Sequence, residues 1–156
     1  MEKINSKIED SEKKISYRVA ALIIQNNKIL IAKNQNNPLY YIIGGGIEIF
    51  ETSEEAITRE IFEEIGIDMK IDKLVFVQER LYQSYYNIKS HEIVFFYLMK
   101  WSNNYNIIEG LKTDNSKESL HWISLNELKN LNLVPKFIKN ISLNKFDQIQ
   151  HIIEKE

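Results

Sequence analysis

Several residue types that would point to a particular chemistry are rare or missing in this chain of 156 residues. It has no cysteine, which excludes disulfides, thiolate zinc sites and a cysteine nucleophile. The three histidines, His91, His121 and His151, are widely spaced, and none has the spacing of a metal site. We therefore expect each histidine to be structural or exposed.

Long apolar runs and a strong net charge are also absent. The longest apolar runs, Val19–Ile24 and Ile93–Met99, are far too short to span a bilayer. The stretch Met1–Lys14 is mixed in charge and has no apolar run, so we do not expect a secretory signal there. The formal net charge of -2 gives no global field toward nucleic acid or an anionic membrane. We expect a soluble, cytoplasmic protein with neither nucleic acid nor a membrane as its partner.

The chain does have the composition of an ordinary globular domain. Hydrophobic residues make up 44% and charged residues 27%. A domain of this size buries roughly 68–70% of its unfolded surface, so it needs no disulfide or metal to fold. We expect residues 1–156 to form one domain. The stretch Ser6–Lys14 is polar, and residues 1–15 should form a short helix or a frayed lead-in.

Short apolar segments separated by polar turns predict a series of strands. Asn26-Asn27 reads as a tight turn between the first two segments, which should therefore form a hairpin. The third segment ends at Gly44-Gly45-Gly46, where no side chain restricts the backbone. The expected strands are Val19–Ile24, Ile29–Ala32, Leu39–Ile43, Leu74–Leu81, Ile88–Trp101 and Ser119–Ile123.

One helix has clear signals at both ends. Thr52 can act as its N-cap, and Glu55 can close a capping box. Gly66 stands where a helix C-terminus favours a left-handed residue. These signals predict a helix from about Ser53 to Ile65. Its apolar stripe, which should face the sheet, consists of Ile57, Ile61 and Ile65.

The C-terminal part is less regular. Ser124 can cap a second helix, and Pro135 suits the first turn of a third. The last stretch, Phe146–Glu154, fits a helix, but Gln150–Glu154 could equally be an edge strand. Strands mixed with two or three helices predict an α/β fold in which helices cover both faces of a mixed sheet.

An acidic cluster lies beside the apolar stripe of the first helix. Glu60, Glu63 and Glu64 stand at i, i+3 and i+4, so their carboxylates share one side. From Glu51 to Asp68 there are seven acidic residues and one basic residue, Arg59. Like charges at this spacing destabilise a helix by about a few tenths of a kcal/mol per pair, and a divalent cation would relieve the repulsion. Most charge runs on helices simply face water, so the surrounding spacing has to decide between the two interpretations.

The stretch from Gly44 to Ile67 reads GGGIEIFETSEEAITREIFEEIGI. Gly45, then five residues, Glu51, then seven residues, and REIFEEIGI from Arg59 resembles the Nudix box at every defining position. The chance of such a match is on the order of 10⁻⁸ or less per starting position. Outside the fixed positions the chain departs twice from common family residues: Ile43 stands where Pro is frequent, and Phe50 where Gly is frequent.

The resemblance implies a Nudix-type α/β/α sandwich with a mixed β-sheet, in which the box is a loop–helix–loop segment. It implies hydrolysis of a pyrophosphate bond in a small-molecule nucleotide, a nucleoside diphosphate linked to another group. It implies Mg²⁺, or Mn²⁺, as the cofactor. The metal ligands implied for this chain are Glu60, Glu63 and Glu64, with the backbone carbonyl of Gly44. Arg59 is expected to pair with Glu51 or with a ligand glutamate.

The base that activates water is open at this point. Glu63 or Glu64 could serve from inside the box. Glu118 is the best candidate from outside it, because the family often supplies an acid from the corresponding loop. Glu92 and Glu79 are weaker candidates, and each of the three outside acids could equally be a surface residue.

The substrate is not readable from the sequence. Arg18 and Arg80 are candidates for contacts with phosphate or ribose, and Tyr82 and Tyr85 for stacking on a base, although such tyrosines more often pack in loops. The ADP-ribose hydrolases of the family that this chain resembles often carry a proline shortly after the box, and this chain has none between Pro38 and Pro135, which mildly disfavours ADP-ribose. The alternative function is a catalytically silent Nudix-like domain that binds a nucleotide or regulates a partner. The oligomeric state is open, with a homodimer as one candidate.

Overall fold

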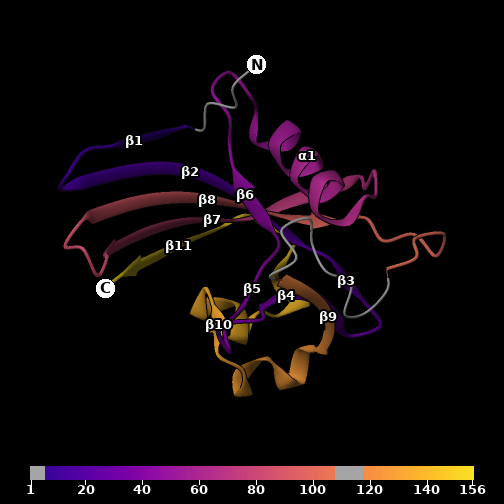
Figure 1. Cartoon of the computed structure of the whole chain (residues 1–156). Coiled ribbons are helices and arrows are strands. Elements are labelled where there is room, and N and C mark those ends of the chain that lie inside the picture. Colours follow the sequence, from indigo (N-terminus) through magenta and orange to yellow (C-terminus); the bar gives the residue numbers. More distant parts are fainter. Residues whose placement is uncertain (1–5, 108–117) are drawn as a thin grey trace.

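Two β-sheets, one α-helix and three 3-10 helices make up the described part of the chain, residues 6–107 and 118–156 of this computed structural model (Figure 1). The larger sheet has the strand order β1-β2-β8-β7-β11, and β6 pairs with β2 beside this path. Strands β2 and β8 are parallel, as are β7 and β11, whereas β7 and β8 are antiparallel. The bounds are β1 (Lys7–Glu9), β2 (Lys13–Leu22), β6 (Gly44–Gly46), β7 (Ile71–Gln83), β8 (Lys89–Met99) and β11 (Gln150–Lys155).

The smaller sheet has the order β10-β5-β4-β3, with β9 paired to β4. Its turn between β3 and β4 holds Asn26 and Asn27, both with positive φ, as a tight hairpin requires. The strands are β3 (Ile24–Gln25), β4 (Lys28–Asn34), β5 (Tyr40–Tyr41), β9 (Glu118–Ser124) and β10 (Leu133–Val134). The 3-10 helices are η1 (Leu125–Asn130), η2 (Lys136–Asn140) and η3 (Leu143–Lys145).

Helix α1 (Ser53–Ile65) confirms the predicted helix and both of its end signals. The Thr52 side chain accepts from the Glu55 backbone, and the Glu55 carboxylate accepts from the Thr52 backbone, which completes the capping box. Gly66 has a φ of 78° and closes the C-terminus by donating to the carbonyl of Phe62. The helix buries Ile57 and Ile61 completely, so its apolar stripe holds the acidic side in a fixed direction.

Two hydrophobic clusters lie on the two faces of the larger sheet. One packs α1 against β2 and β8, through residues such as Ile61, Val19 and Tyr97. The other packs Phe76 and Phe96 against Phe137 and Phe146 in edge-to-face contacts. The predicted α/β fold with a mixed sheet is therefore confirmed. The layer opposite α1 consists of the smaller sheet and 3-10 helices, because only short segments connect β9, β10 and β11.

The N-terminal segment corrects the expectation of a helix or frayed lead-in over residues 1–15. Residues 1–5 lie outside the described part, but Lys7–Glu9 forms β1 and pairs antiparallel with Lys14–Ser16 of β2. The turn between them is closed by the Asp10 carboxylate, which accepts from the backbone of Glu12 and Lys13 at 2.8 and 2.7 Å. Pairing with a long neighbouring strand overrides the polar composition of this segment.

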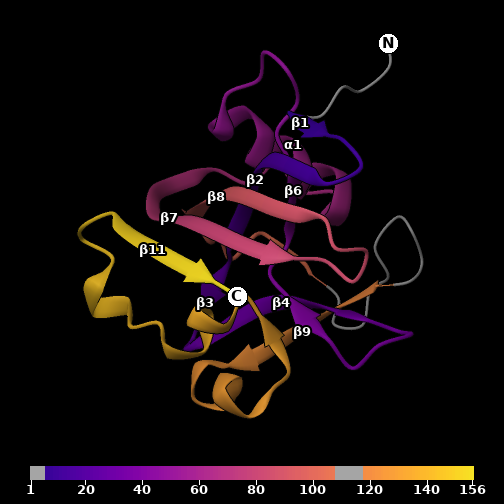
Figure 2. The same cartoon turned by 90° about the vertical axis from the view of Figure 1, so that its left-hand side faces the viewer.

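Other differences concern short elements. The expected strand at Leu39–Ile43 is reduced to Tyr40–Tyr41, and the glycines after it form a strand themselves, β6. The helices expected at Ser124 and Pro135 are single 3-10 segments, and Ser124 makes no side-chain cap. The last stretch is the edge strand β11, beside β7 (Figure 2). No helix among the described residues is long and apolar enough to cross a membrane.

Candidate active site

The glycine strand β6 is pressed between β2 and α1. It pairs antiparallel with β2, which places Gly44 opposite Ala20 and Gly45 opposite Val19. A Cβ at Gly44 would overlap the carbonyl of Val19, and a Cβ at Gly45 would overlap the carboxylate of Glu60. At Gly44 only glycine lets β6 and β2 approach this closely, whereas a side chain at Gly45 would displace the carboxylate of Glu60. The glycines of the sequence motif thus bring the first acid of the cluster against backbone.

Arg59 organises the acids around it. Its Nε and Nη2 donate to the two oxygens of Glu51 at 2.7 and 2.9 Å, a bidentate pair. Its Nη1 donates to Glu60 Oε1 at 2.8 Å and lies 3.6 Å from Glu63 Oε2, and its Nη2 also donates to the carbonyl of Gly46 at 2.9 Å. The bond to Glu51 raises the pKa of Arg59 further. The pairing expected from the sequence is present with both kinds of partner, so Arg59 holds Glu60 in one orientation.

Glu64 of α1 lies close to charged residues of both β2 and β9. Burial raises its pKa to about 8, and the charges of Glu60, Glu118 and Glu63 add to this, while Arg18 of β2 lowers it. Glu63, in contrast, is exposed. The spacing of these glutamates predicted that their carboxylates share one side of the helix. Within that side the structure exposes Glu63 to water, whereas Glu64 turns toward β2 and β9.

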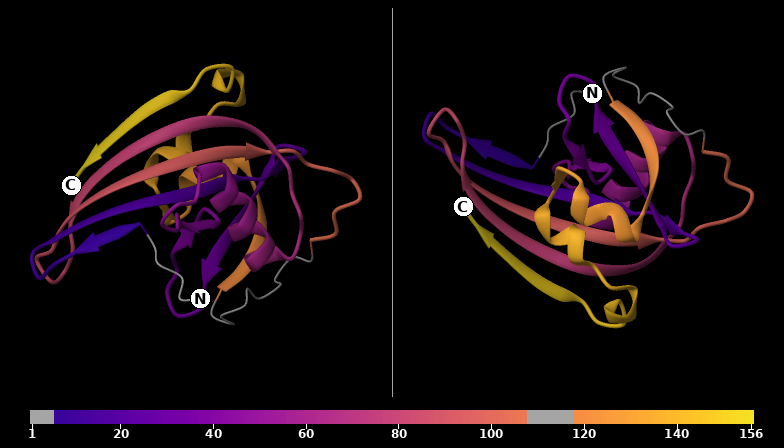
Figure 3. Two further views of the ribbon diagram at one scale, coloured as in Figure 1. Left: turned by 90° about the horizontal axis from the view of Figure 1, so that it is seen from above. Right: turned by 90° about the horizontal axis from the view of Figure 1, so that it is seen from below.

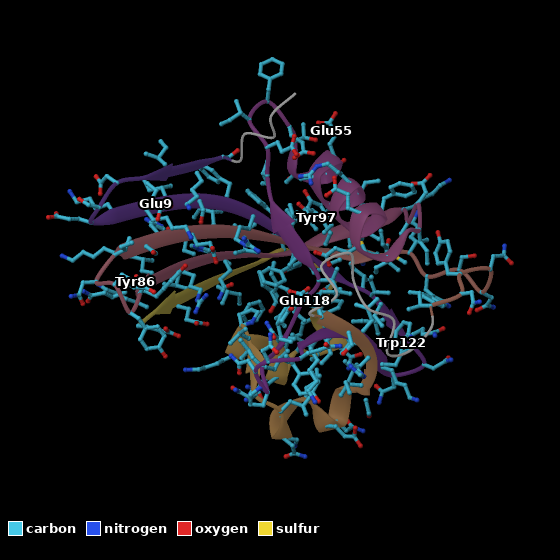
Figure 4. The ribbon with its side chains drawn as sticks, viewed as in Figure 1. Glu9, Glu55, Tyr86, Tyr97, Glu118 and Trp122 are labelled. Atoms are coloured by element: carbon cyan, nitrogen blue, oxygen red, sulfur yellow. The ribbon has the colours of Figure 1, made fainter. Side chains whose placement is uncertain are left out.

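Glu118 reaches the cluster from a distant part of the chain. It begins β9 and pairs with Asn34 of β4, which places it between α1 and the smaller sheet (Figure 4). The Tyr41 hydroxyl is buried beside it and forms no hydrogen bond of regular geometry with any described residue. Burial and the nearby Glu118 carboxylate raise the pKa of Tyr41. Of the outside acids proposed as bases, Glu118 therefore lies next to the acidic cluster.

The two weaker candidates lie elsewhere. Glu92 is buried in β8, accepts from Ser16 Oγ at 3.3 Å, and has one oxygen 3.8 Å from Arg18 Nε. Glu79 lies on the opposite face of the sheet and pairs with His151 at 2.8 Å. Glu92 is thus near the site as a partner of Arg18, whereas Glu79 is outside it.

The donor set suits a hard divalent cation. Glu60, Glu63, Glu64 and Glu118 offer only carboxylate oxygens, the ligands that Mg²⁺ and Mn²⁺ prefer. No three acidic or histidine side chains of the described residues surround a single ion position as they stand. Burial, with the added repulsion of Glu60, Glu118 and Glu63, raises the pKa of Glu64, and a bound cation would favour its charged form. The chemistry of these residues therefore fits a divalent metal.

A cavity of about 230 Å³ adjoins the acidic cluster. Arg18 lies between the cavity and the acidic cluster, since it lines the cavity and its charge also lowers the pKa of Glu64. Arg80 lines it too and is held by Glu154, with its guanidinium 4.4 Å from the centre of the Tyr82 ring. The polar lining consists of Arg18, Tyr41, Gln78, Arg80 and Glu92, and the apolar lining includes Leu39, Val94, Phe96, Val134 and Pro135.

Of the four residues that the sequence suggested for substrate contacts, the structure places only the two arginines at the cavity. Arg18 and Arg80 line the cavity, whereas Tyr82 supports Arg80 and Tyr85 is fully exposed in the turn between β7 and β8. Gln78, which also lines the cavity, was not among the residues predicted from the sequence. A polar residue at a buried position of an otherwise apolar strand was the available signal, but it requires knowing which face of the strand is covered.

An α/β sandwich whose capped helix carries Glu60, Glu63 and Glu64, the first of them against a glycine strand, is the arrangement of the Nudix class. The NUDIX domain model matches residues 15–142, and the chain belongs to this family. Over 60 residues it is 43% identical to an ADP-ribose pyrophosphatase of Methanocaldococcus jannaschii and 32% identical to a MutT-like protein of Streptomyces ambofaciens. These matches cover 36% and 38% of this chain and span only 36% and 39% of the relatives.

A solved MutT protein of Bacillus halodurans has the same fold. Its TM-score to this chain is 0.69 at 17% identity, and the match covers 87% of this chain and 89% of the other. At this identity the likeness concerns the fold. It agrees with the family assignment made from the sequence.

Proposed function

We propose that this protein is a metal-dependent pyrophosphohydrolase that cleaves a nucleoside diphosphate linked to another group. The observation that carries the proposal is the position of Arg18 between the acidic cluster and the cavity. On one side of it lie the acids of α1, and on the other side lies a cavity with a second arginine, Arg80. A pyrophosphate bound over the acids would therefore place one of its substituents in the cavity.

In this proposal Glu60, Glu63 and Glu64, with the carbonyl of Gly44, hold Mg²⁺ or Mn²⁺. When bound, such a cation neutralises phosphate charge and lowers the pKa of a coordinated water. Arg59 keeps Glu60 oriented through its bonds to Glu51 and Glu60. The rest of the chemistry is positioning and charge stabilisation, as in other phosphoryl transfers.

The chain's own groups then bind the anion and take up the proton. Arg18 is partly exposed at the cavity edge and is placed to pair with a phosphate oxygen. The attacking water must lose a proton, and the two acids that meet beside the buried Tyr41 hydroxyl, Glu64 and Glu118, are placed to accept it. Both remain candidates, and separate variants distinguish them.

The substrate class is also part of the proposal. The relative with 43% identity is named an ADP-ribose pyrophosphatase, and its substrate is a nucleoside diphosphate joined to a second group. The missing proline after the box disfavours ADP-ribose itself for this chain. A small-molecule substrate, a cytoplasmic location, and the absence of nucleic acid and membrane partners belong to the same proposal.

A substrate panel tests it. ADP-ribose, nucleoside diphosphate sugars, NADH, dinucleoside polyphosphates and nucleoside triphosphates are incubated with Mg²⁺, and released nucleoside monophosphate is measured. We expect turnover of at least one diphosphate-linked compound by the wild type and by Glu54→Gln, which removes an exposed acid of the same helix outside the cluster. Glu64→Gln should lose most of it. Binding of a nucleotide without turnover of any compound would favour the silent binding domain.

A further inference from the structure

A buried hydroxyl, that of Tyr41 in β5, lies beside the acidic cluster. It forms no hydrogen bond of regular geometry with any described residue. A buried hydroxyl without a partner costs free energy, so most such groups in folded proteins are hydrogen-bonded. The ring of Tyr41 packs against the hydrophobic cluster under α1, which fixes the side chain. The hydroxyl is therefore held at one place, and the question is which group it serves there.

The strand register brings Tyr41 and Glu118 to one face of the smaller sheet. Tyr41 pairs with Ala32 of β4, and Ala32 pairs with Leu120 of β9. Glu118 stands two residues before Leu120, so its side chain returns to the face that Tyr41 and Ala32 share. Strands β4 and β9 lie side by side in the view from below (Figure 3, right). The two side chains thus approach each other from the two sides of β4.

The residue between them on β4 is small. Ala32 is only 1% exposed, and its side chain ends at Cβ. Two strand spacings amount to roughly 10 Å, a distance that an aromatic and a long side chain can bridge together. A larger residue at this position would stand between Tyr41 and Glu118. The alanine therefore leaves room for a contact across β4.

The Glu118 carboxylate is the acid that acts most on this hydroxyl. Burial raises the pKa of Tyr41, Glu118 adds to this as a hydrogen-bond acceptor and by its charge, and the charge of Glu64 contributes less. A carboxylate has two oxygens and accepts several hydrogen bonds. A bond from Tyr41 is therefore compatible with the other interactions of Glu118.

The hydroxyl is not presented to the cavity. Tyr41 lines the cavity together with Arg18 and Gly44, but its hydroxyl oxygen is buried. A substituent of the substrate bound in the cavity would meet the ring of Tyr41 instead. This separates two roles for Tyr41, because a substrate contact needs an accessible hydroxyl and a contact with Glu118 does not.

We propose that the Tyr41 hydroxyl donates a hydrogen bond to the Glu118 carboxylate and thereby positions Glu118 for hydrolysis. The inference rests on the proposed function and adds a positioning residue to it. Glu118 is the first residue of β9, so its side chain has strand neighbours on one side only. A hydrogen bond from a packed tyrosine restricts such a side chain to one direction, as hydrogen bonds to carboxylates do around metal sites.

Tyr41→Phe removes the hydroxyl and keeps the ring. On the best substrate of the panel we expect kcat to fall at least about fivefold with KM nearly unchanged, because the hydroxyl does not meet the substrate. In the Glu118→Gln background the same substitution should cause no further loss. Tyr40→Phe is the matched control and should keep the kcat of the wild type, since the Tyr40 ring lies against His121 on the other face of β5.

Two kinetic results would overturn the proposal. A rise in KM at constant kcat in Tyr41→Phe would make Tyr41 a substrate contact. A loss in the double variant equal to the product of the two single losses would mean that Tyr41 acts independently of Glu118.

Thermal melts in EDTA test the contact without any substrate. Loss of a hydrogen bond to a charged group should lower the melting temperature of Tyr41→Phe by roughly 2–8 °C, whereas loss of a hydroxyl without a partner should leave it unchanged or raise it. The decrease should vanish in the Glu118→Ala background, which lacks the acceptor, and Tyr40→Phe should melt like the wild type.

The melts also separate this inference from the proposed function. A Tyr41→Phe variant that melts at or above the temperature of the wild type overturns the contact, as does an equal decrease in the Glu118→Ala background. If the panel shows no hydrolysis, the melts still decide on the contact, so failure of the hydrolase and failure of the contact are distinct results.

Discussion

Replacing Glu64 by glutamine should stabilise the metal-free protein above neutral pH even though it removes turnover. Burial, together with Glu60, Glu118 and Glu63, raises the pKa of Glu64 from about 4.5 to about 8 in the folded protein. Below the unfolded value the carboxyl is protonated in both states, and nothing is lost. As the pH rises from about 4.5 to about 8, the unfolded chain ionises Glu64 while the folded protein does not, so the free energy of unfolding falls. Above about 8 the loss is complete.

The size of this effect follows from the same values. Each pH unit within the window lowers the free energy of unfolding by about 1.4 kcal/mol. Glu64 keeps some contact with water, which weakens its interactions with the other carboxylates, so we expect a total loss of about 2–4 kcal/mol. For a domain of this size that corresponds to a difference of about 5–15 °C in melting temperature. Glutamine has no such titration, so the variant should be flat across the window at this position.

Urea unfolding in EDTA at several pH values between 5 and 9 measures the difference. The wild type should lose stability relative to Glu64→Gln as the pH rises, and Glu54→Gln, an exposed acid on the same helix, should run parallel to the wild type. Excess Mg²⁺ should restore the wild type and change Glu64→Gln much less. Parallel pH curves for the wild type and Glu64→Gln in EDTA would refute the reasoning, because Glu64 would then ionise normally.

Further predictions concern single positions. Gly45→Ala should lower turnover strongly at small cost in stability, because its Cβ would displace the flexible carboxylate of Glu60; turnover above half that of the wild type would contradict this. Gly66→Val should instead lower stability and leave turnover of the folded protein unchanged. A φ of 78° strains a β-branched residue by roughly 1–2 kcal/mol, and urea unfolding measures this loss. Glu118→Gln should lower turnover 10²–10⁴-fold with little change in melting temperature if it is the base; a loss below about threefold, with a large loss in Glu64→Gln, would place the base in the box.

Helix α1 and its acids were readable from the sequence because their signals are local. The capping box, the glycine at the C-terminus and the spacing of the glutamates all lie within one short stretch, Thr52–Gly66. A helix fixes the relative directions of residues three and four apart without any tertiary contact. For that reason both the bounds of α1 and the shared side of its acids were predicted. How deeply each acid is buried was not predicted, since Glu64 is partly covered by the distant strands β2 and β9.

The partners of α1 from elsewhere could not be derived in the same way. Glu118 stood out only through resemblance to a family, and its position beside Glu64 and Tyr41 depends on β9 pairing with β4. The pairing of strands far apart in sequence has no local signal. Because long-range strand pairing has no local signal, neither the strand β1 nor the position of Gln78 in the cavity was predicted from the sequence.

Mn²⁺ binding measured by electron paramagnetic resonance tests the central claim, that the acids of α1 form a metal site that drives hydrolysis. The protein is titrated with Mn²⁺, and the turnover of the best substrate from the panel is followed in the same titration. The wild type and Glu54→Gln should bind the ion with equal affinity, and turnover should rise with occupancy. Glu60→Gln, Glu63→Gln and Glu64→Gln should each weaken binding at least tenfold and lose turnover in parallel. Unchanged affinity in these three variants, or turnover that persists in EDTA, would contradict the account.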